Sequence, residues 1–316
     1  MKINVGIVGY GNLGKAVEKE ILKNPKYNLM AIFSRRIVSS KFNTLVEDYD
    51  SHKSYVGKID LMFLCGGSLS DLEFQSEEIA KHFNFINTFD THAKIEKHIT
   101  SLNAICKKSN TVAIVSCGWD PGIFSVVRAL MFSISNQKPT TFWGKGISMG
   151  HSDAIRRVEG VIDGIQFTIP NKEAVVQARK ETLSKNTPKH FRECFVVSHE
   201  PNKSKIEKQI KSIPNYFKNQ PTTVKFVSED TLLKLKNKLF HKGEIICTFT
   251  SDTNLKNSLN FSVKMQSNPN FTAKIMVAYS NAVINLKNKK ISGAFTPLEI
   301  PASELFLNKN KLYEFC

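Results

Sequence analysis

Apolar and polar positions follow two different periods along the first 118 residues. The mostly apolar, β-branched run at 3–8 is typical of a buried strand, whereas apolar positions 13, 17, 21 and 22 recur at helical spacing. Further strands are predicted at 29–33, 59–65, 85–88 and 111–116, helices at 69–81 and 95–107, and a short strand and helix within the polar stretch 37–58. Strands that alternate with helices predict a Rossmann-like, doubly wound parallel sheet.

The pattern changes beyond residue 118. Longer, partly alternating strands are predicted at 161–168, 191–197, 222–227 and 244–250, and helices at 172–180, 204–213, 230–238 and 271–286. Such strands favour an α+β domain with a mixed, mostly antiparallel sheet. We expect a first domain of residues 1–118, to which a helix at about 269–295 returns, and a second domain of residues 119–268 with 296–316. A cleft between two such domains is a common place for a small-molecule site.

The first predicted strand runs into a glycine-rich turn, Gly9-Tyr10-Gly11-Asn12-Leu13-Gly14, that opens the first helix. In a turn of this spacing the first glycine permits the tight bend, the second lets the backbone approach a pyrophosphate, and the third lets the helix pack on the strand. Because a strand precedes the glycines and a helix follows them, the spacing favours a dinucleotide site. The alternative is a strand-helix-strand unit whose glycine turn binds nothing.

The end of the second strand indicates which dinucleotide is bound. Enzymes that use NAD usually carry an acidic residue there, which binds the adenosine ribose. This chain instead has Ser34, Arg35 and Arg36, a hydroxyl and two guanidinium groups suited to a 2′-phosphate. We therefore expect NADP, although a solvated basic turn has the same composition.

Small or polar residues also follow the other predicted strands of the first domain. Since the carboxyl ends of parallel strands form one ligand-binding edge, these turns extend the predicted cofactor site. The expected cofactor contacts are Gly9, Tyr10, Gly11, Asn12, Leu13, Ser34, Arg35, Arg36, Gly66, Gly67, Ser68, Leu69, Thr88, Phe89, Asp90, Cys117, Gly118, Trp119, Asp120 and Pro121.

Asp90 and Asp120 both lie just beyond a predicted strand, on the same edge as the glycine turn. Either aspartate, taken alone, fits a helix N-cap, and Pro121 would suit the first position of a helix. Two carboxylates beside a cofactor turn instead favour a shared cationic group of a substrate. We expect both to be catalytic and to contact the substrate.

Composition narrows the possible partners. The 316 residues are 41% hydrophobic and 23% charged, no apolar run is long enough to span a membrane, and the chain enters its first strand without a signal-peptide pattern, so we expect a cytoplasmic protein. The six cysteines show no metal-site or disulfide spacing, and no metal is expected. The net charge of +16 comes from lysines spread along the chain without a nucleic-acid motif, which favours a solvated surface that attracts anionic small molecules over nucleic-acid binding.

Several motifs together resemble the meso-diaminopimelate dehydrogenase family. They are GYGNLG, FSRR, FDTH, GWDPG, FWGKG, GHSDAIRR, RECFVV, NPNFTA and GAFTPLE, in this order between residue 3 and about residue 300. The resemblance implies reversible NADP-dependent oxidative deamination of the D-centre of meso-2,6-diaminopimelate to L-2-amino-6-oxopimelate and ammonia, a step of lysine and peptidoglycan precursor synthesis. It also implies a homodimer, for which the second domain is the expected contact.

The resemblance further implies which residues bind the substrate. Asp90 and Asp120 match positions near the reacting D-amino centre, Trp143 matches an aromatic beside it, and the distal L-amino acid end falls to Thr168, Arg192, His241 and Asn268. An arginine suits a carboxylate and a threonine adds a neutral donor. From the residues alone, Trp143 fits core packing, His241 a lysine-rich loop and Asn268 a turn before proline.

The short polar segment 148–153 is predicted to be a loop that closes over a ligand. It contributes Met149 and Gly150 to the expected substrate contacts. Met149 stands where relatives often carry glutamine, which would remove one hydrogen bond, whereas Gly150 still offers its backbone. His151 and Asp153 are assigned to loop structure and not to an acid-base pair.

Three other functions remain open at this point. The chain fits another NADP-dependent Rossmann reductase of the lysine pathway, which would show no ammonia-dependent turnover. It also fits a broader D-amino-acid dehydrogenase, which the methionine at position 149 would permit. A non-enzymatic alternative is an NADP-sensing regulator that binds DNA, which a salt-dependent shift of duplex DNA would reveal.

Overall fold

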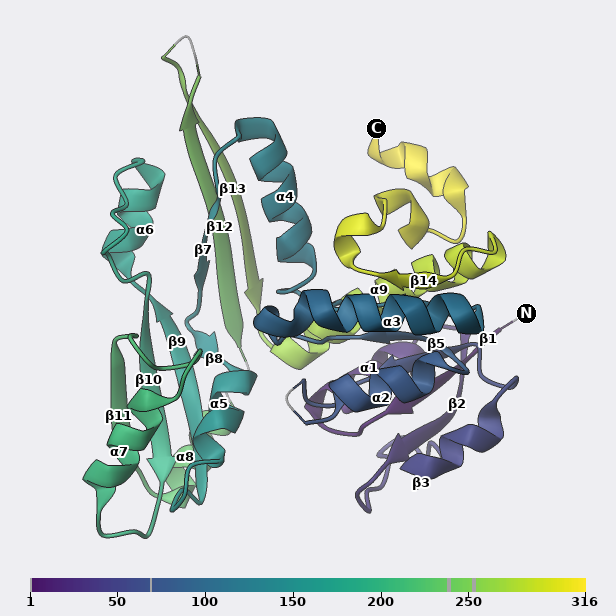
Figure 1. Ribbon diagram of the computed structural model, residues 1–316, viewed down its shortest axis with the longest axis horizontal. Helices are drawn as coiled ribbons and strands as arrows, with labels where there is room; N and C mark the ends of the chain where they lie inside the picture. The colour runs from purple at the N-terminus through teal and green to yellow at the C-terminus, as the bar shows by residue number, and fades with distance from the viewer. Residues whose placement is uncertain (1, 69, 238–239, 252–253) are drawn as a thin grey trace. The chain divides into compact units, whose positions relative to one another are not determined.

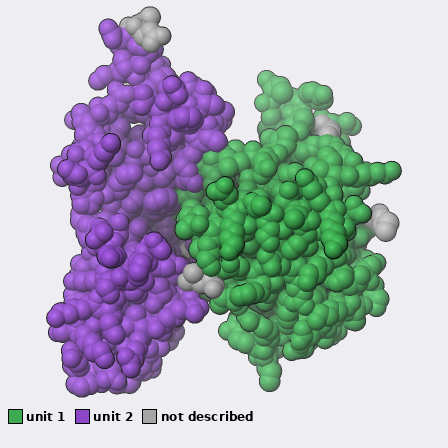
Figure 2. Space-filling view, in the orientation of Figure 1, with its two compact units in different colours: residues 1–126, 269–316 green, residues 127–268 purple. Residues whose placement is uncertain are grey.

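The computed structural model describes residues 2–68, 70–237, 240–251 and 254–316. These residues form two compact units, one of residues 1–126 with 269–316 and one of residues 127–268 (Figure 2). Each unit has its own sheet or sheets and its own hydrophobic core. Figure 1 labels the helices and strands.

A parallel sheet forms the centre of the first unit. Its strands are β1 (Ile3–Val8), β2 (Tyr27–Ser34), β3 (Val46–Asp48), β4 (Leu61–Leu64), β5 (Asn84–Asn87), β6 (Val112–Ile114) and β14 (Gly293–Phe295). They pair in parallel in the order β14-β6-β5-β4-β1-β2-β3, which is the doubly wound order with one strand added beside β6. The predicted Rossmann-like sheet is confirmed.

Helices connect these strands and bury apolar faces against them. They are α1 (Asn12–Leu22), α2 (Leu72–Ala80), α3 (Ile95–Ser109) and α9 (Asn268–Asn288), with 3₁₀ turns η1 (Tyr49–Tyr55), η2 (His92–Lys94), η3 (Pro297–Glu299), η4 (Ala302–Leu305) and η5 (Lys309–Phe315). The core between sheet and helices includes Phe33, Phe83, Phe85 and Phe89, each at most 1% exposed. Full burial of one such side chain contributes about 1.5–3 kcal/mol to folding. These phenylalanines therefore stabilise the sheet whose edge carries the turns.

The second unit contains two sheets. Its strands are β7 (Thr140–Trp143), β8 (Gly146–Ile147), β9 (Asp163–Pro170), β10 (His190–Val197), β11 (Thr222–Phe226), β12 (His241–Thr250) and β13 (Lys256–Met265). One sheet has the order β11-β10-β9-β8 and the other β13-β12-β7. All their pairings are antiparallel except that of β10 with β11, so the prediction of a mixed, mostly antiparallel arrangement is confirmed.

The helices of this part of the chain are α4 (Ile123–Ser135), which begins in the first unit, α5 (Met149–Arg156), α6 (Lys172–Arg179), α7 (Lys203–Ser212) and α8 (Glu229–Lys236). Helix α4 lies along the three-stranded sheet (Figure 1), where Arg128 donates to the Thr141 hydroxyl at 3.3 Å and the Ser135 hydroxyl lies 3.2 Å from the Cys247 sulfur. Helix α5 packs against β9, with Ala154 and Ile155 buried.

The loop prediction for residues 148–153 is wrong, because this segment is the first part of α5. Ser148 stands at the N-cap, and its carbonyl accepts from both the backbone N–H and the hydroxyl of Ser152, at 3.0 and 2.6 Å. Gly150 and the polar residues beside it hid the helix in the sequence, since its apolar face, Ala154 and Ile155, falls in the last turn.

Several elements were not predicted. Strand β13 was missed although Leu259, Phe261, Val263 and Met265 alternate with polar residues, which is the period of a half-buried strand. Helix α4 is apolar on most sides, and β7, β8 and β14 are only two to four residues long. His241, expected in a loop, is the first residue of β12, and Asn268, expected in a turn, is the first residue of α9.

The unit boundaries differ from the expected domains at two places. Residues 119–126 belong to the first unit, and so does the C-terminal segment 296–316, which was expected with the second. The segment is held by α9, because Asn281 donates to the carbonyl of Leu305 at 2.8 Å and Asn285 donates to that of Glu304 at 2.9 Å. No helix within the described residues has the length and apolar composition needed to cross a membrane.

Candidate active site

The turn after β1 has the geometry that its glycine spacing predicts. Gly9 has a left-handed φ of 88°, and a side chain at Gly14 would place its Cβ 2.2 Å from the Gly9 carbonyl oxygen. A Cβ at Gly11, by contrast, would meet no atom of the described residues within 4 Å. The open space at Gly11, next to the N-terminus of α1, leaves room for a phosphate group. This turn therefore fits a dinucleotide.

Ser34, Arg35 and Arg36 follow at the end of β2. The Ser34 hydroxyl donates to the carbonyl of Arg36 at 2.9 Å and accepts from its backbone N–H at 3.1 Å, so it fixes the bend in which the arginines lie. Arg35 forms an ion pair with Asp71, which also accepts from the backbone N–H of Gly67 at 3.0 Å. Asp71, which the sequence analysis missed, thus joins the arginine bend to the turn after β4.

Asn87 holds the turns after β5 and β6 together. It is fully buried at the end of β5, and its side-chain oxygen accepts from the backbone N–H groups of Phe89 at 3.2 Å and Ser116 at 3.1 Å. Its carbonyl accepts from the N–H of Cys117 at 2.8 Å. The sequence analysis missed this residue as well, although a polar amide inside an apolar strand was a detectable signal.

Leu69, a predicted cofactor contact in the turn after β4, lies outside the described residues.

Asp90 and Asp120 occupy the turns after the adjacent strands β5 and β6. Neither is the residue before a helix, because η2 begins at His92 and α4 at Ile123, so the capping interpretation fails for both. The backbone N–H of Asp90 donates to the Ser68 hydroxyl at 3.0 Å. Although Asp90 keeps contact with solvent, the protein around it desolvates the carboxyl and raises its pKa, while the Ser68 hydroxyl acts in the opposite direction.

In the second unit, strand register brings Arg192 and Thr168 together. The two residues are partners across β10 and β9, and the Arg192 guanidinium donates to the Thr168 hydroxyl at 2.8 Å. The buried Nε of Arg192 has no hydrogen-bond partner among the described residues, and none of their ion pairs includes this arginine. A guanidinium remains charged at neutral pH, and burying part of it is costly without an anion. Arg192 is therefore suited to an anionic ligand.

Two histidines near Arg192 remain neutral. Burial, with the charge of Arg192 as the second cause, lowers the pKa of both His151 and His190 to about 3. The geometry at His190 agrees, because its Nε2 accepts the backbone N–H of Trp143 at 2.8 Å and must be unprotonated to do so. At neutral pH the two histidines therefore add no positive charge, and the Arg192 guanidinium carries the charge of this group.

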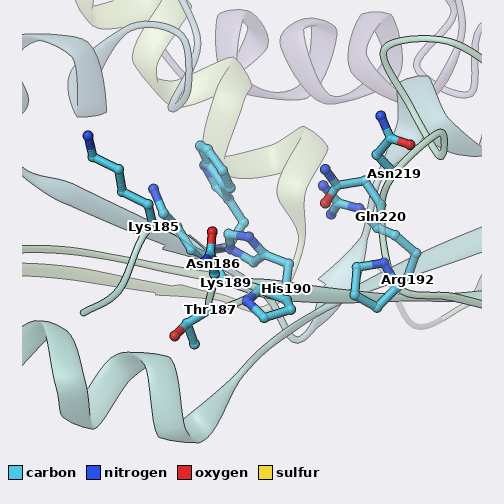
Figure 3. A pocket seen from close by; sticks show the side chains of 11 residues that line it. Lys185, Asn186, Thr187, Lys189, His190, Arg192, Asn219 and Gln220 are labelled. Carbon is cyan, nitrogen blue, oxygen red and sulfur yellow. Dashed lines mark hydrogen bonds between the residues drawn. The ribbon is translucent and has the colours of Figure 1, made fainter. Parts of the chain in front are cut away.

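A cavity of about 680 Å³ opens beside these residues. Figure 3 shows Lys189, His190, Arg192 and Gln220 around it. Trp143 also lines it, and its ring lies 5.1 Å from that of His190. No acidic side chain is among the described residues of its lining. A cavity with basic and aromatic walls favours an anionic, partly aliphatic ligand.

His241 is the first residue of β12. A Cβ at Gly146 would come within 2.4 Å of the His241 ring, so the ring packs directly on that glycine. Gly146 is in turn the register partner of Thr168, and Trp143 pairs with Gly243 of β12. Trp143, Thr168, Arg192 and His241, which are far apart in the sequence, are therefore gathered on adjoining strands.

Met149 and Gly150 form the first turn of α5, where backbone N–H groups have no partner within the helix. Met149 is 43% exposed. His151 and Asp153 are not paired with each other: Nδ1 of His151 lies 2.8 Å from the Ser148 hydroxyl, and Asp153 accepts from Arg157 at 2.9 Å. The assignment of both to structure holds, but the structure is a helix.

Asn268 is the last residue of the second unit and opens α9. No cluster of three or more histidine, cysteine or acidic residues in the described part of the chain is arranged to hold a metal ion.

A doubly wound sheet with a glycine turn, together with a basic cavity in a separate unit, is the arrangement expected of a dinucleotide-dependent oxidoreductase. The family model of the diaminopimelic acid dehydrogenase C-terminal domain matches residues 118–267. Over 95% of this chain and 94% of theirs, the meso-diaminopimelate D-dehydrogenases of Ureibacillus thermosphaericus and Lysinibacillus sphaericus are 45% and 44% identical to it. The chain belongs to the meso-diaminopimelate D-dehydrogenase family, as its motifs predicted.

Solved structures agree with this assignment. The DAP dehydrogenase of Corynebacterium glutamicum in complex with DAP superposes with a TM-score of 0.94 at 36% identity, covering 99% of this chain and 98% of that one. An engineered D-amino acid dehydrogenase bound to NADP+ superposes with a TM-score of 0.93 at 34% identity, covering 99% of both chains. The fold, the enzyme class and the cofactor predicted from the sequence are confirmed at the level of the family.

Proposed function

We propose that this protein catalyses the reversible NADP-dependent oxidative deamination of the D-centre of meso-2,6-diaminopimelate, giving L-2-amino-6-oxopimelate and ammonia. The observation that carries this assignment is the half-buried Arg192, whose buried Nε has no partner and which has no acidic partner in the described part of the chain, beside Trp143 in a basic cavity. Such an arginine binds a carboxylate of an amino acid. The product serves lysine and peptidoglycan precursor synthesis.

The cofactor contacts lie at the carboxyl edge of the parallel sheet. The glycine turn and the first N–H groups of α1 suit the pyrophosphate, and Ser34, Arg35 and Arg36 stand where the 2′-phosphate of NADP distinguishes it from NAD. The turns after β4, β5 and β6 complete this set with the residues predicted there. Bound NADP accepts the two electrons of the oxidation.

The L-end of the substrate is assigned to the second unit. Arg192 would bind its carboxylate in two hydrogen bonds, with the Thr168 hydroxyl as a neutral neighbour. His241 and Asn268 are further contacts by their match to the family. The backbone of Gly150, in the first turn of α5, offers an N–H to a carboxylate, and Met149 adds an apolar contact.

The D-centre is assigned to Asp90, Asp120 and Trp143. The substrate amine arrives as an ammonium ion and must lose a proton before its carbon can be oxidised. The raised pKa of Asp90 brings this carboxylate closer to neutral pH, where a general base is most effective. Asp120 would hold the ammonium and, later, the water that hydrolyses the imine. Trp143 would pack against the carbon atoms beside that centre.

Fixing the L-end explains how one of two amino acid centres is chosen. Both ends of meso-diaminopimelate carry the same groups, so the pocket can distinguish them only by their stereochemistry. When Arg192 and its neighbours hold the L-end, the remaining end has D configuration.

A broader D-amino-acid dehydrogenase is the second candidate, and Met149 is the observation that favours it. This side chain is 43% exposed, and a thioether where the family resemblance implies an amide would remove one polar selection at the substrate. The engineered D-amino acid dehydrogenase mentioned above has the same fold at 34% identity. Comparable rates with simple D-amino acids would support this candidate.

Two further expectations concern the setting of the enzyme. We infer a homodimer that acts in the cytoplasm. Helix α4 supports the dimer, because Leu130, Phe132 and Ile134 are each about half exposed, and large apolar side chains on one helix favour a protein partner. Sedimentation at micromolar concentration tests the dimer, and cell fractionation tests the location.

The decisive test of the activity is the appearance of NADPH when purified protein meets NADP and meso-diaminopimelate at mildly alkaline pH. The LL and DD isomers, simple D-amino acids and NAD serve as parallel substrates. Turnover only with the meso isomer and NADP is expected. Absence of turnover with every isomer, while NADP still binds, would refute the proposed substrate and leave the fold unaffected.

A further inference from the structure

The arginine segment, residues 35–41, follows β2 without regular secondary structure. Its two arginines are the groups assigned above to the 2′-phosphate. Such a segment binds the 2′-phosphate weakly if it becomes ordered only when the cofactor binds, because immobilising long side chains and a loop costs conformational entropy. Its anchors therefore decide how well it discriminates between cofactors.

Glu18 anchors the far end of this segment. It lies on α1, one turn beyond Gly14, and is fully buried. One carboxylate oxygen accepts from the Ser40 hydroxyl at 2.5 Å, and the other accepts from the Tyr10 hydroxyl at 2.5 Å. The same carboxylate is thus bonded to the arginine segment and to the glycine turn.

The two hydroxyls match the needs of a buried carboxylate, which is costly unless its oxygens accept hydrogen bonds. Burial and the bond to Glu18 raise the pKa of Tyr10, so the phenol keeps its proton and remains a donor. Ser40 also accepts from the backbone N–H of Phe42 at 2.9 Å, which ties the bend of the segment to the same point. At the near end, Asp71 holds Arg35 by their ion pair.

We propose that Glu18 is a positioning residue for cofactor selection, which fixes the arginine segment to the glycine turn through Ser40 and so presents Arg35 and Arg36 to the 2′-phosphate. This inference rests on the proposed use of NADP. Since NAD lacks the 2′-phosphate, its binding does not depend on the segment. Tyr10 joins the glycine turn, which both cofactors share, to the same anchor, because its hydroxyl interacts with Ser40 and with the backbone of Lys41 as well as with Glu18.

Ser40 offers the cleaner variant, because it is half-buried whereas Glu18 lies in the core. Ser40→Ala removes the bond to the segment and leaves Glu18 bonded to Tyr10. We expect the Kd for NADP, measured by calorimetry, and the KM for NADP to rise roughly tenfold, the scale of one hydrogen bond to a charged group. The Kd for NAD, kcat at saturating NADP and the KM for the amino acid should stay unchanged.

Ser40→Thr, which keeps the hydroxyl, should restore NADP affinity. Ser39→Ala, at the exposed neighbouring serine, is the matched control. Glu18→Gln should behave like a milder Ser40→Ala. Equal weakening of both cofactors by Ser40→Ala, or no change in either, would overturn the positioning role.

The outcomes also separate this inference from the proposed reaction. If the protein binds NADP more tightly than NAD but does not oxidise meso-diaminopimelate, the reaction fails while the calorimetric comparison still tests Glu18. If the unaltered protein binds both cofactors equally, there is no preference for Glu18 to set, and the inference is wrong.

Discussion

The turns of the first unit and the strand faces of the second are suited to recognition in different ways. The glycine turn offers its backbone, and the residues that shape it, Gly9, Gly11 and Gly14, lie within six positions of each other. The second unit offers side chains, and Thr168, Arg192 and His241 meet only because β9, β10, β8 and β12 bring them into adjoining positions.

This difference explains what each half can discriminate. Backbone N–H groups bind any pyrophosphate, so cofactor selection must be added by a few side chains at the end of β2. The half-buried guanidinium of Arg192 is held by Thr168 and carries a single charge, so as proposed it would select a ligand by the position of its carboxylate. The substitutions described next test this division, in order of expected effect.

In the first unit, the Asp90 carboxylate is proposed to act as the general base of the reaction. Asp90→Asn should lower kcat by about 10²–10⁴, the range for loss of a general base, with the KM for NADP little changed. Asp50→Asn, which replaces an exposed aspartate paired with Lys53, is the control. A kcat within a factor of three of the unaltered enzyme would remove Asp90 from catalysis.

The pH profile sharpens this test. The active carboxylate form of Asp90 is lost as pH falls through its raised pKa, so the acid limb of kcat/KM should reflect that group. The Ser68 hydroxyl lowers this pKa, so Ser68→Ala should move the acid limb to higher pH. A limb that stays in place, or moves to lower pH, would contradict the assignment.

Arg192→Ala should lower kcat/KM for meso-diaminopimelate by on the order of 10²-fold and raise its KM, because it removes a charge-assisted clamp. The Kd for NADP should be unchanged. Arg179→Ala is a matched control in the same unit, since Arg179 is exposed and paired with Glu244. Arg192→Lys, which keeps the charge and loses the forked geometry, should fall between the two. Kinetics unaffected by Arg192→Ala would refute the clamp.

Arg35→Ala combined with Arg36→Ala should remove most of the preference for NADP, roughly 30-fold, while use of NAD is spared. Steady-state kinetics with both cofactors measure the change. Lys23→Ala with Lys26→Ala removes the same net charge from the same unit and should leave the preference intact. Equal weakening of both cofactors would mean that the arginines are structural.

His190→Gln should change the pH dependence of stability. The pKa of His190 falls from 6.5 to about 3 on folding, so below pH 6.5 the unfolded chain binds a proton that the folded chain does not. The free energy of unfolding then decreases as pH falls towards 3, by up to about 1.4 kcal/mol per pH unit for this group. Glutamine can accept the Trp143 N–H without titrating and should flatten that slope.

Urea unfolding at pH 7, 6 and 5 measures the slope. His199→Gln, at an exposed histidine, is the control. An identical slope in the His190 variant would show that His190 is not the group responsible.

The sequence predicted the proposed cofactor contacts of the first unit more completely than the proposed substrate contacts of the second unit. The spacing of Gly9, Gly11 and Gly14 and the arginines after β2 are local signals, and local geometry follows from them. Asp71 and Glu18 were missed, because their roles depend on contacts with Arg35 and Ser40 across the fold.

In the second unit, only the family resemblance singled out His241. Its neighbours in sequence are lysine-rich, and its position beside Gly146 arises from the pairing of distant strands. The loop expected at 148–153 failed for a related reason: α5 is stabilised by packing on β9 and not by a helical apolar period. His190 was missed because nothing local signals that its ring accepts the Trp143 N–H.

The most direct test of the central claim follows the hydrogen that leaves the substrate. Purified protein is given NADP and meso-2,6-diaminopimelate labelled with deuterium at the α-carbon of the D-centre alone, or at that of the L-centre alone, and the mass of the NADPH is measured. The account predicts deuterated NADPH only from the D-labelled substrate. Deuterated NADPH from the L-labelled substrate, or no NADPH from either while NADP binds, would contradict it.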